Sequence, residues 1–510
     1  MTSPSGEGVS PRLYSLGESY HQNYIRSGSD LLKLKDLLLI SLLTFAALLI
    51  HGYHAGAEDA EIYLPGIEKI LHPELFPFNS QFFEAHAHST LFPNLIAASV
   101  RISHLRLGTA LFLWQIASIF LLLLACWQLS ARCFSDTKAR WCGVALVAAL
   151  LTLPIAGTAL YIMDQYLNPR NLSAFVGIFA MVRVLDRKYL QATLFLVIAG
   201  VIHPLMSVFA LSFCILLGGV REFSLPWFVL YLPFGIPFAA PPSSYHQVAL
   251  THSYFYLTQW RWYEWLGVIG PMVILFWFAR LAKARQWPNV TLLSSTALIY
   301  ELVYVVLAVM IDVPSRFEAL ARLQPMRSLH LLYVLMLVLS GGVLAEFVFK
   351  NHLWRWLALF VPVCTGMFFA QRVLFPASAH IEWPWAQPKN QWMEAFRWIR
   401  KNTPENSIFA LDPEYMNLPS EDEQGFRAVA RRSSLADSIK DSGAVSMFPA
   451  MADEWWRQVQ AQSGWSKFQL QDFHRLQAQY GVDWVVLQQP GLPGLDCPYQ
   501  NRVVLVCRLD

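Results

Sequence analysis

The stretch that decides the fold reads DLLLISLLTFAALLIHGYHAGAEDAEIY over residues 36–63. Its first part, residues 36–53, is an apolar run long enough to cross a bilayer as a helix. The acidic pair Glu58-Asp59 follows, and a segment of mixed polar and aromatic residues continues to about residue 105. Placing a carboxylate in lipid costs free energy, whereas a carboxylate in water is common. A large loop that begins with an acidic pair therefore indicates a site at the membrane surface.

The composition indicates a polytopic α-helical membrane protein. The chain has 510 residues, of which 55% are hydrophobic and 14% charged, and its mean hydropathy is +0.38. Soluble domains carry about 25% charged residues. The net charge of +3 and the lack of a basic run exclude nucleic acid as a partner. No small-residue cleavage site follows the first apolar run, so we expect this run to stay as a signal anchor with residues 1–35 as a cytoplasmic segment.

Further apolar runs predict about eleven membrane spans in total. They lie near 36–53, 107–129, 141–160, 171–184, 189–203, 205–220, 225–240, 264–281, 289–311, 328–349 and 355–375. Basic residues gather in alternate loops, so the positive-inside rule predicts a cytoplasmic N-terminus and an outer C-terminus. This topology makes residues 36–375 a transmembrane core with a large first outer loop, 54–106, and residues 376–510 an extracytoplasmic domain.

The last part of the chain is predicted to be an α/β domain. Trp392, Phe396 and Ile399 have the spacing of an amphipathic helix. Apolar segments at 407–410, 482–487 and 503–506 predict strands, and two helices are expected near 451–462 and 467–480.

Two cysteines in this domain, Cys497 and Cys507, are candidates for a disulfide. Turn-forming Pro498 and Asn501 lie between them and let the chain fold back. The bond is expected if the compartment is oxidising. The alternative is a pair of free thiols, since the sequence does not give the separation that a disulfide requires.

The acidic pair is the candidate catalytic site. If a helix begins at Ala57, Asp59 and Tyr63 lie on one face. Asp59, assisted by Glu58, then acts as a proton acceptor, and any divalent cation, Mg²⁺ or Mn²⁺, is expected on Asp59. The alternative is that the acids only favour a helix N-terminus through the helix dipole.

Arginines in the outer segments break the basic-inside pattern. They are Arg170, Arg261, Arg316, Arg322 and Arg327. A guanidinium binds phosphate with two parallel hydrogen bonds, and outside a membrane that phosphate belongs to a lipid carrier or headgroup. We expect Arg327, at the start of a helix, to hold a donor phosphate with help from Arg170 or Arg261. Snorkelling and surface ion pairs are the alternative.

Other polar residues of the outer segments could complete an acceptor or sugar site. They are His54, Tyr63, Asp164, His246 and His252. The alternative is that they are ordinary loop and turn residues.

The whole arrangement resembles the GT-C superfamily of membrane glycosyltransferases. The resemblance lies in a multi-span core, an acidic motif near the start of a large first outer loop, and a C-terminal domain outside the membrane. It implies a polyprenyl-phosphate sugar donor and a catalytic acid at Asp59, with Glu58 beside it. The chain lacks the Trp-Trp-Asp motif of oligosaccharyltransferases, because Trp455-Trp456 is preceded rather than followed by acids. The acceptor, whether glycan, lipid or protein, is therefore left open.

The sequence thus predicts a cell-envelope glycosyltransferase that transfers a hexosyl or pentosyl group on the outer face of a bacterial-type inner membrane. The alternatives are a non-enzymatic lipid or polysaccharide transporter or assembly protein, and a degenerate GT-C member that only binds lipid-linked sugar. An enzyme requires Asp59 and a phosphate-binding arginine at one outer cavity, whereas a transporter requires a polar path through the bilayer.

Overall fold

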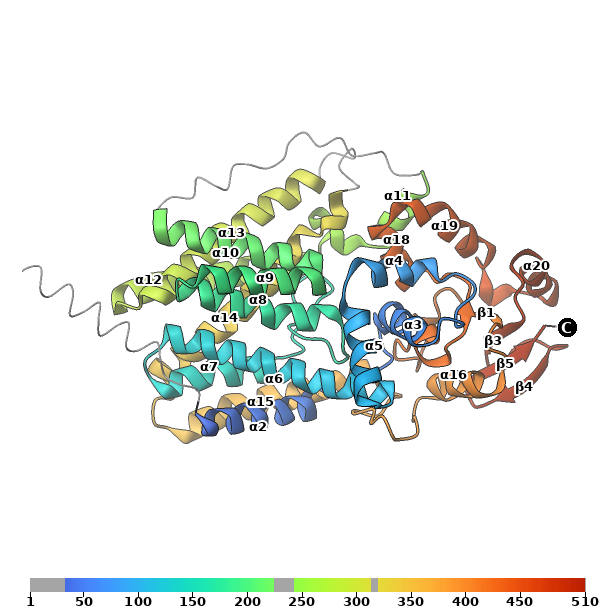
Figure 1. The fold of residues 1–510 in the computed structure, drawn as a ribbon, viewed down its shortest axis with the longest axis horizontal. Coiled ribbons are helices and arrows are strands. Elements are labelled where there is room, and N and C mark those ends of the chain that lie inside the picture. The colour runs from blue at the N-terminus through green and yellow to red at the C-terminus, as the bar shows by residue number, and fades with distance from the viewer. Residues whose placement is uncertain (1–32, 224–242, 313–319, 510) are drawn as a thin grey trace, which may run out of the picture.

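The computed structural model describes residues 33–223, 243–312 and 320–509. Figure 1 shows long helices packed side by side at one end of the molecule and a mixed helix-and-sheet domain at the other. The short helices of the first loop lie between these two parts. A multi-helical membrane core followed by a C-terminal α/β domain is the fold class expected from the sequence.

The core contains seven helices that are long and apolar enough to cross a membrane, counted over the described residues. The chain is therefore a multi-pass membrane protein. The core helices are α2 (Leu34–His51), α6 (Leu107–Cys133), α7 (Thr137–Ala149), α8 (Pro169–Leu185), α9 (Tyr189–Ile202), α10 (Pro204–Phe223), α12 (Trp262–Arg285), α13 (Pro288–Asp312), α14 (Leu329–Leu344) with a π-helical turn (Ala345–Phe349), and α15 (Leu353–Leu374).

These helices follow the apolar runs, with two qualifications. The expected span 141–160 is helical only to Ala149, because the chain then turns irregularly back toward the polar segment before α8. The expected span 225–240 and Arg316 lie outside the described residues. His203 separates α9 from α10, so the run 189–220 does form two helices.

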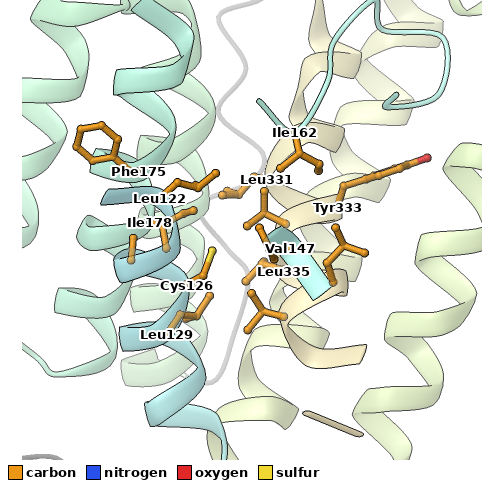
Figure 2. Close-up of a cluster of buried hydrophobic side chains, with 14 of the residues drawn as sticks. Leu122, Cys126, Leu129, Val147, Ile162, Phe175, Ile178, Leu331, Tyr333 and Leu335 are labelled. Carbon is orange, nitrogen blue, oxygen red and sulfur yellow. The ribbon is translucent and has the colours of Figure 1, made fainter. Parts of the chain in front are cut away.

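Helix α14 is the centre of the core, and nearly all of its side chains are buried. Figure 2 shows Leu331 and Leu335 facing Leu122 and Cys126 of α6. Close approach to α7 depends on glycine, because a Cβ on Gly341 would lie 2.5 Å from the carbonyl oxygen of Cys142. Small residues at such contacts are typical of helix packing in membranes.

The first loop, residues 54–106, is built from three short helices, α3 (Ala60–Leu71), α4 (Gln81–Ser89) and α5 (Phe92–Ser103). The expectation that a helix begins at Ala57 is wrong, since α3 begins at Ala60. The backbone before it pairs with the C-terminal domain instead: Glu58 donates to the carbonyl of Glu423 (2.8 Å) and Gly56 accepts from Gly425 (2.7 Å).

The C-terminal domain contains a five-stranded sheet of order β2-β1-β3-β5-β4. The three strands β2, β1 and β3 are parallel, and β5 is antiparallel to β3 and β4. The elements are α16 (Gln391–Asn402), β1 (Ile408–Ala410), α17 (Phe426–Ala430), β2 (Ser433–Ser434), α18 (Lys440–Met447), α19 (Ala452–Ala461), α20 (Leu470–Tyr480), β3 (Trp484–Gln488), β4 (Asp496–Gln500) and β5 (Val504–Arg508).

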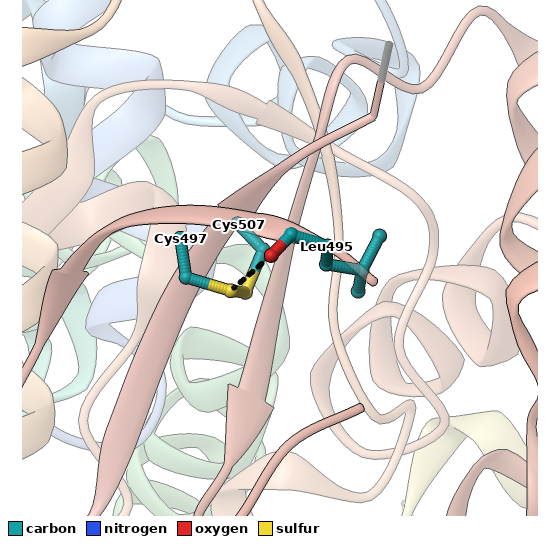
Figure 3. Close-up of a disulfide and its surroundings, with 3 residues drawn as sticks. All are labelled: Leu495, Cys497 and Cys507. Carbon is teal, nitrogen blue, oxygen red and sulfur yellow. Dashed lines mark hydrogen bonds between the residues drawn. A yellow bond between two sulfur atoms is a disulfide. The ribbon is translucent and has the colours of Figure 1, made fainter. Parts of the chain in front are cut away.

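A disulfide joins the two antiparallel strands at the end of this sheet. It links Cys497 of β4 to Cys507 of β5, as Figure 3 shows. The sequence predicts β1, β3, β5 and the three longer helices of the domain, but not the two-residue strand β2 or the strand β4.

Candidate active site

Asp59 stands where the membrane core, the first loop and the C-terminal domain meet. Its carboxylate accepts a hydrogen bond from Nη1 of Arg170 at 2.7 Å, and Nζ of Lys440 lies 3.4 Å from its other oxygen. Lys440 also contacts the carboxylate of Glu58. Asp59 is the N-cap residue of α3, yet its side chain makes no capping hydrogen bond. The carboxylate therefore serves the neighbouring cations rather than the helix end.

Arg170 is positioned by the beginning of α8. Asn168 caps that helix by accepting from the backbone of Asn171 at 3.0 Å, and Pro169 occupies its first turn. A cation near a helix N-terminus is disfavoured by the helix dipole. Here Asp59 and Asp164 (3.1 Å) offset that cost and fix the guanidinium.

These groups line one side of a cavity of about 620 Å³. Glu58, Asp59, Asp164, Arg170 and Arg327 come from the core and first loop, and the C-terminal domain contributes the opposite wall. That wall includes Glu414, Asn417, Ser438, Ile439, Lys440 and Ser442. The cavity therefore exists only because the two parts of the molecule pack together.

Two cations keep Asp59 ionised. Burial alone would raise the pKa of Asp59, but the positive charges of Lys440 and then Arg170 hold it well below the usual range. Lys440 responds in the opposite direction: burial disfavours its charge, yet Glu58 and Asp59 raise its pKa overall. The acids and the cations of this cluster therefore stabilise one another's charged forms.

A second acid, Glu423, lies beside Glu58. Burial and a side-chain hydrogen bond with Glu58 raise the pKa of Glu423 to about 9. Glu423 is thus protonated at neutral pH and donates to the Glu58 carboxylate, while Lys440 keeps the pKa of Glu58 low against the effect of burial.

Arg327 differs from Arg170 because its guanidinium has no protein partner. No hydrogen bond or ion pair joins that side chain to any other described residue, and its Nε is buried without an acceptor. The residue lies in a short 3₁₀ turn, Pro325–Ser328, just before α14. It borders the polar cavity on one side and an apolar cleft between α8, α10 and α14 on the other. Arg327 is half-buried, and a guanidinium that is partly withdrawn from water without a protein partner favours the binding of an anion.

The structure brings only some of the expected residues together. Asp164 and the buried ring of His252 line the cavity with Asp59. Asp164 also accepts from Nδ2 of Asn168 at 2.5 Å. Burial lowers the pKa of His252 to about 4, so this imidazole is neutral at pH 7.

Four expected residues lie elsewhere. Arg261 is exposed and donates to the hydroxyl of Tyr263 at 3.0 Å, so it does not reach the cavity as a phosphate ligand. His54 is buried, stacked on Phe375 (3.8 Å between ring centroids) and 3.5 Å from Glu382. Tyr63 packs against other aromatic rings, and His246 is exposed on α11 (Tyr245–Leu250). None of the four lines the cavity.

Lys440 is the main residue that sequence reasoning misses. It is 382 positions from Glu58 along the chain, and nothing local marks it as functional. The usable signal is indirect: an acidic pair buried beside a membrane requires a cation, and the C-terminal domain is the remaining source of one.

The divalent cation expected on Asp59 stays a prediction. Within residues 33–223, 243–312 and 320–509, no group of three or more His, Cys, Asp or Glu side chains could hold a metal ion. The two carboxylates that Mg²⁺ would use, Asp59 and Glu58, already neutralise Lys440 and Arg170.

No protein-family model and no curated protein matches the chain. Among solved structures, it is similar to the oligosaccharyltransferase of Archaeoglobus fulgidus with a tethered acceptor peptide. The two share 12% identity over 90% of this chain and 69% of that one, with a TM-score of 0.49. A likeness of this degree does not assign an activity.

Proposed function

We propose that the protein is a membrane glycosyltransferase that moves a sugar from a polyprenyl-phosphate donor to an acceptor on the outer face of the inner membrane. The observation that carries this proposal is the pairing, at one cavity, of an ionised Asp59 with an Arg327 guanidinium that lacks a protein partner. A base for the acceptor and a cation for the leaving phosphate are the two groups that such a transfer needs.

Arg327 suits the phosphate of a lipid better than a soluble phosphate. Its neighbouring cleft is lined by apolar residues of three membrane helices, among them Ala174, Gly177, Phe209 and Leu331. The cleft volume is about 20 Å³, so a lipid tail would have to part these helices to enter. The guanidinium stands between a narrow apolar cleft and a polar cavity, and an amphiphilic donor has one part suited to each.

Asp59 is a weak base as long as both cations hold it. An incoming phosphate would compete for Arg170 and Lys440, and the pKa of Asp59 would then rise toward its usual value. The carboxylate would gain basicity only when the donor is bound, and could then accept the proton of an acceptor hydroxyl. The sugar–phosphate bond breaks, the acceptor oxygen forms the new bond to the sugar, and the released phosphate stays with the cations. We assign no step to a metal ion.

A binding-only protein is the second candidate, and one observation favours it. A carboxylate paired with two cations resembles a structural ion-pair network as much as a catalytic base. In that case, the cavity would bind lipid-linked sugar without turnover.

An assay with purified protein separates the two. Radiolabelled polyprenyl-phosphate sugars are supplied with a membrane extract that contains glycan, lipid and protein acceptors. Label that moves to an acceptor fraction with the wild-type protein, and not with Asp59→Asn, supports the enzyme. Donor binding without transfer by any preparation supports the binding protein, and the absence of binding rejects both.

A further inference from the structure

A second and larger cavity lies on the other side of the acidic loop. Its volume is about 950 Å³, and it is bounded by the beginning of α6, the segment 382–388 and helix α16. Ala55 and Gly56 line it, whereas Glu58 and Asp59 line the cavity described above. Residues 55–59 therefore form a partition between two separate spaces.

The lining of this second cavity is basic and aromatic. Five basic side chains face three acidic ones. Among the five, Arg431 contacts Glu68, and Arg397 donates to the carbonyl of Ala386 at 3.0 Å. Arg106, Arg400 and Lys401 are exposed, and their charged groups form no hydrogen bond or ion pair with the described part of the chain. Three unpaired cations around one hollow attract an anion.

The cavity lies at the beginning of the apolar helix α6. Arg106 is the residue immediately before α6. Trp383 and Trp385 are 38% and 69% exposed, and their rings lie 5.4 Å and 6.3 Å from the ring of Phe112 in the second turn of that helix. Exposed tryptophan beside the end of an apolar helix is typical of the headgroup region of a bilayer. Basic residues at this depth bind anionic headgroups.

We propose that this cavity binds the phosphate-bearing headgroup of an anionic lipid in the leaflet that faces the C-terminal domain. Arg400 and Lys401, at the end of α16, contact the phosphate together with Arg106, and the two tryptophans lie among the neighbouring lipids. The volume is in the range of sites for whole small molecules, so a free phosphate ion would leave most of it empty. This assignment does not depend on glycosyl transfer.

The test uses the full-length protein in detergent, with phosphatidylglycerol, phosphatidylcholine or inorganic phosphate added, and counts bound molecules by native mass spectrometry. The variant Arg400→Gln/Lys401→Gln removes two cations from the cavity. The matched control is Lys467→Gln/Arg508→Gln, which removes two exposed cations that do not line it. Because all four positions are exposed, neither variant disturbs the core.

We expect phosphatidylglycerol to bind the wild-type and control proteins in preference to phosphatidylcholine. The double variant at Arg400 and Lys401 should bind it roughly thirtyfold more weakly. Equal binding of the two lipids, or equal affinity of this variant and the control, overturns the proposal. Displacement of phosphatidylglycerol by an equal concentration of inorganic phosphate would identify a site for soluble anions and overturn the lipid assignment.

Discussion

Lys440 of the C-terminal domain reaches across to Asp59 of the first loop, with 3.4 Å between Nζ and the nearer carboxylate oxygen. The contact joins two parts of the molecule that are far apart in sequence, and it closes one wall of the polar cavity. The proposed site is therefore shared between the membrane core and the domain that follows it. Each of its charged members can be removed separately.

The substitution Asp59→Asn should abolish sugar transfer and leave the protein folded. The amide keeps the shape of the side chain but loses the charge and the proton affinity of a base, and a loss of roughly a hundredfold or more is typical of such groups. Transfer of label from a polyprenyl-phosphate sugar measures it. Glu58→Gln is the control for the pair and should reduce turnover less. Normal turnover of Asp59→Asn would leave Asp59 with only a structural role.

Replacement of Lys440 by Gln should move the acidic limb of the pH–rate profile to higher pH. Lys440 is the strongest influence that lowers the pKa of Asp59, so without it the carboxylate takes up its proton at a higher pH. The profile of kcat/KM reports the titration of the free enzyme. Lys467→Gln removes an exposed cation that does not line the cavity and should leave the limb in place. An unchanged limb in Lys440→Gln would mean that Asp59 does not titrate in the reaction.

The substitution Arg327→Ala should weaken the binding of the donor more than it lowers the rate of sugar transfer from a donor that is already bound. A hydrogen bond from a charged group is worth about 1.5–3 kcal/mol, and loss of one such contact corresponds to roughly tenfold to a hundredfold in affinity. Equilibrium binding of a labelled polyprenyl phosphate measures it. Arg322→Ala is the matched control, since Arg322 lies five positions earlier and does not line the cavity. Equal affinity of both variants would show that the phosphate binds elsewhere.

Topology is the assumption that places this site outside the cytoplasm. The alternating basic loops predict that Lys283 lies inside and Gln391 outside. Reporter enzymes fused after these two positions should therefore give opposite signals, with the outer signal at Gln391. A cytoplasmic signal at Gln391 would place the cavity, and its donor, on the inner face.

The membrane helices could be predicted because hydropathy is a local property. The runs that begin near residues 36, 107 and 264 match α2, α6 and α12 within a few residues. The beginning of α3 could not be predicted in the same way. Its position depends on backbone pairing with Glu423 and Gly425, which are remote in sequence.

The site was predictable only in part, for the same reason. Asp59, Arg170 and Arg327 stand out as charges beside membrane helices, where each charge requires a partner. Arg261 has the same features in the sequence, yet its side chain lies at the surface and donates to the hydroxyl of Tyr263. Lys440 and Glu423 belong to a polar domain in which charged residues are ordinary, so only the tertiary contact distinguishes them.

Glu423 gives a prediction about stability and pH. Its pKa is raised to about 9, by burial and then by the hydrogen bond with Glu58, from an ordinary value near 4.5. A raised pKa means that the folded protein binds a proton that the unfolded chain releases. The proton on Glu423 therefore contributes to the free energy of unfolding. This contribution is fully present below the pKa that Glu423 has in the unfolded chain, and it is lost as the pH rises through the pKa that it has in the folded protein.

The substitution Glu423→Gln should remove that dependence. The amide can still donate a hydrogen bond to Glu58 and has no proton to release, so the melting temperature of the variant should change less between pH 5 and pH 8 than that of the wild type. At pH 5 the two proteins should melt close together, and at pH 8 the variant should be the more stable. Thermal unfolding in detergent measures both, with Glu394→Gln, an exposed acid of α16, as the control. Parallel curves for Glu423→Gln and the wild type would mean that Glu423 is ionised in the folded protein, and that Lys440 neutralises three carboxylates rather than two.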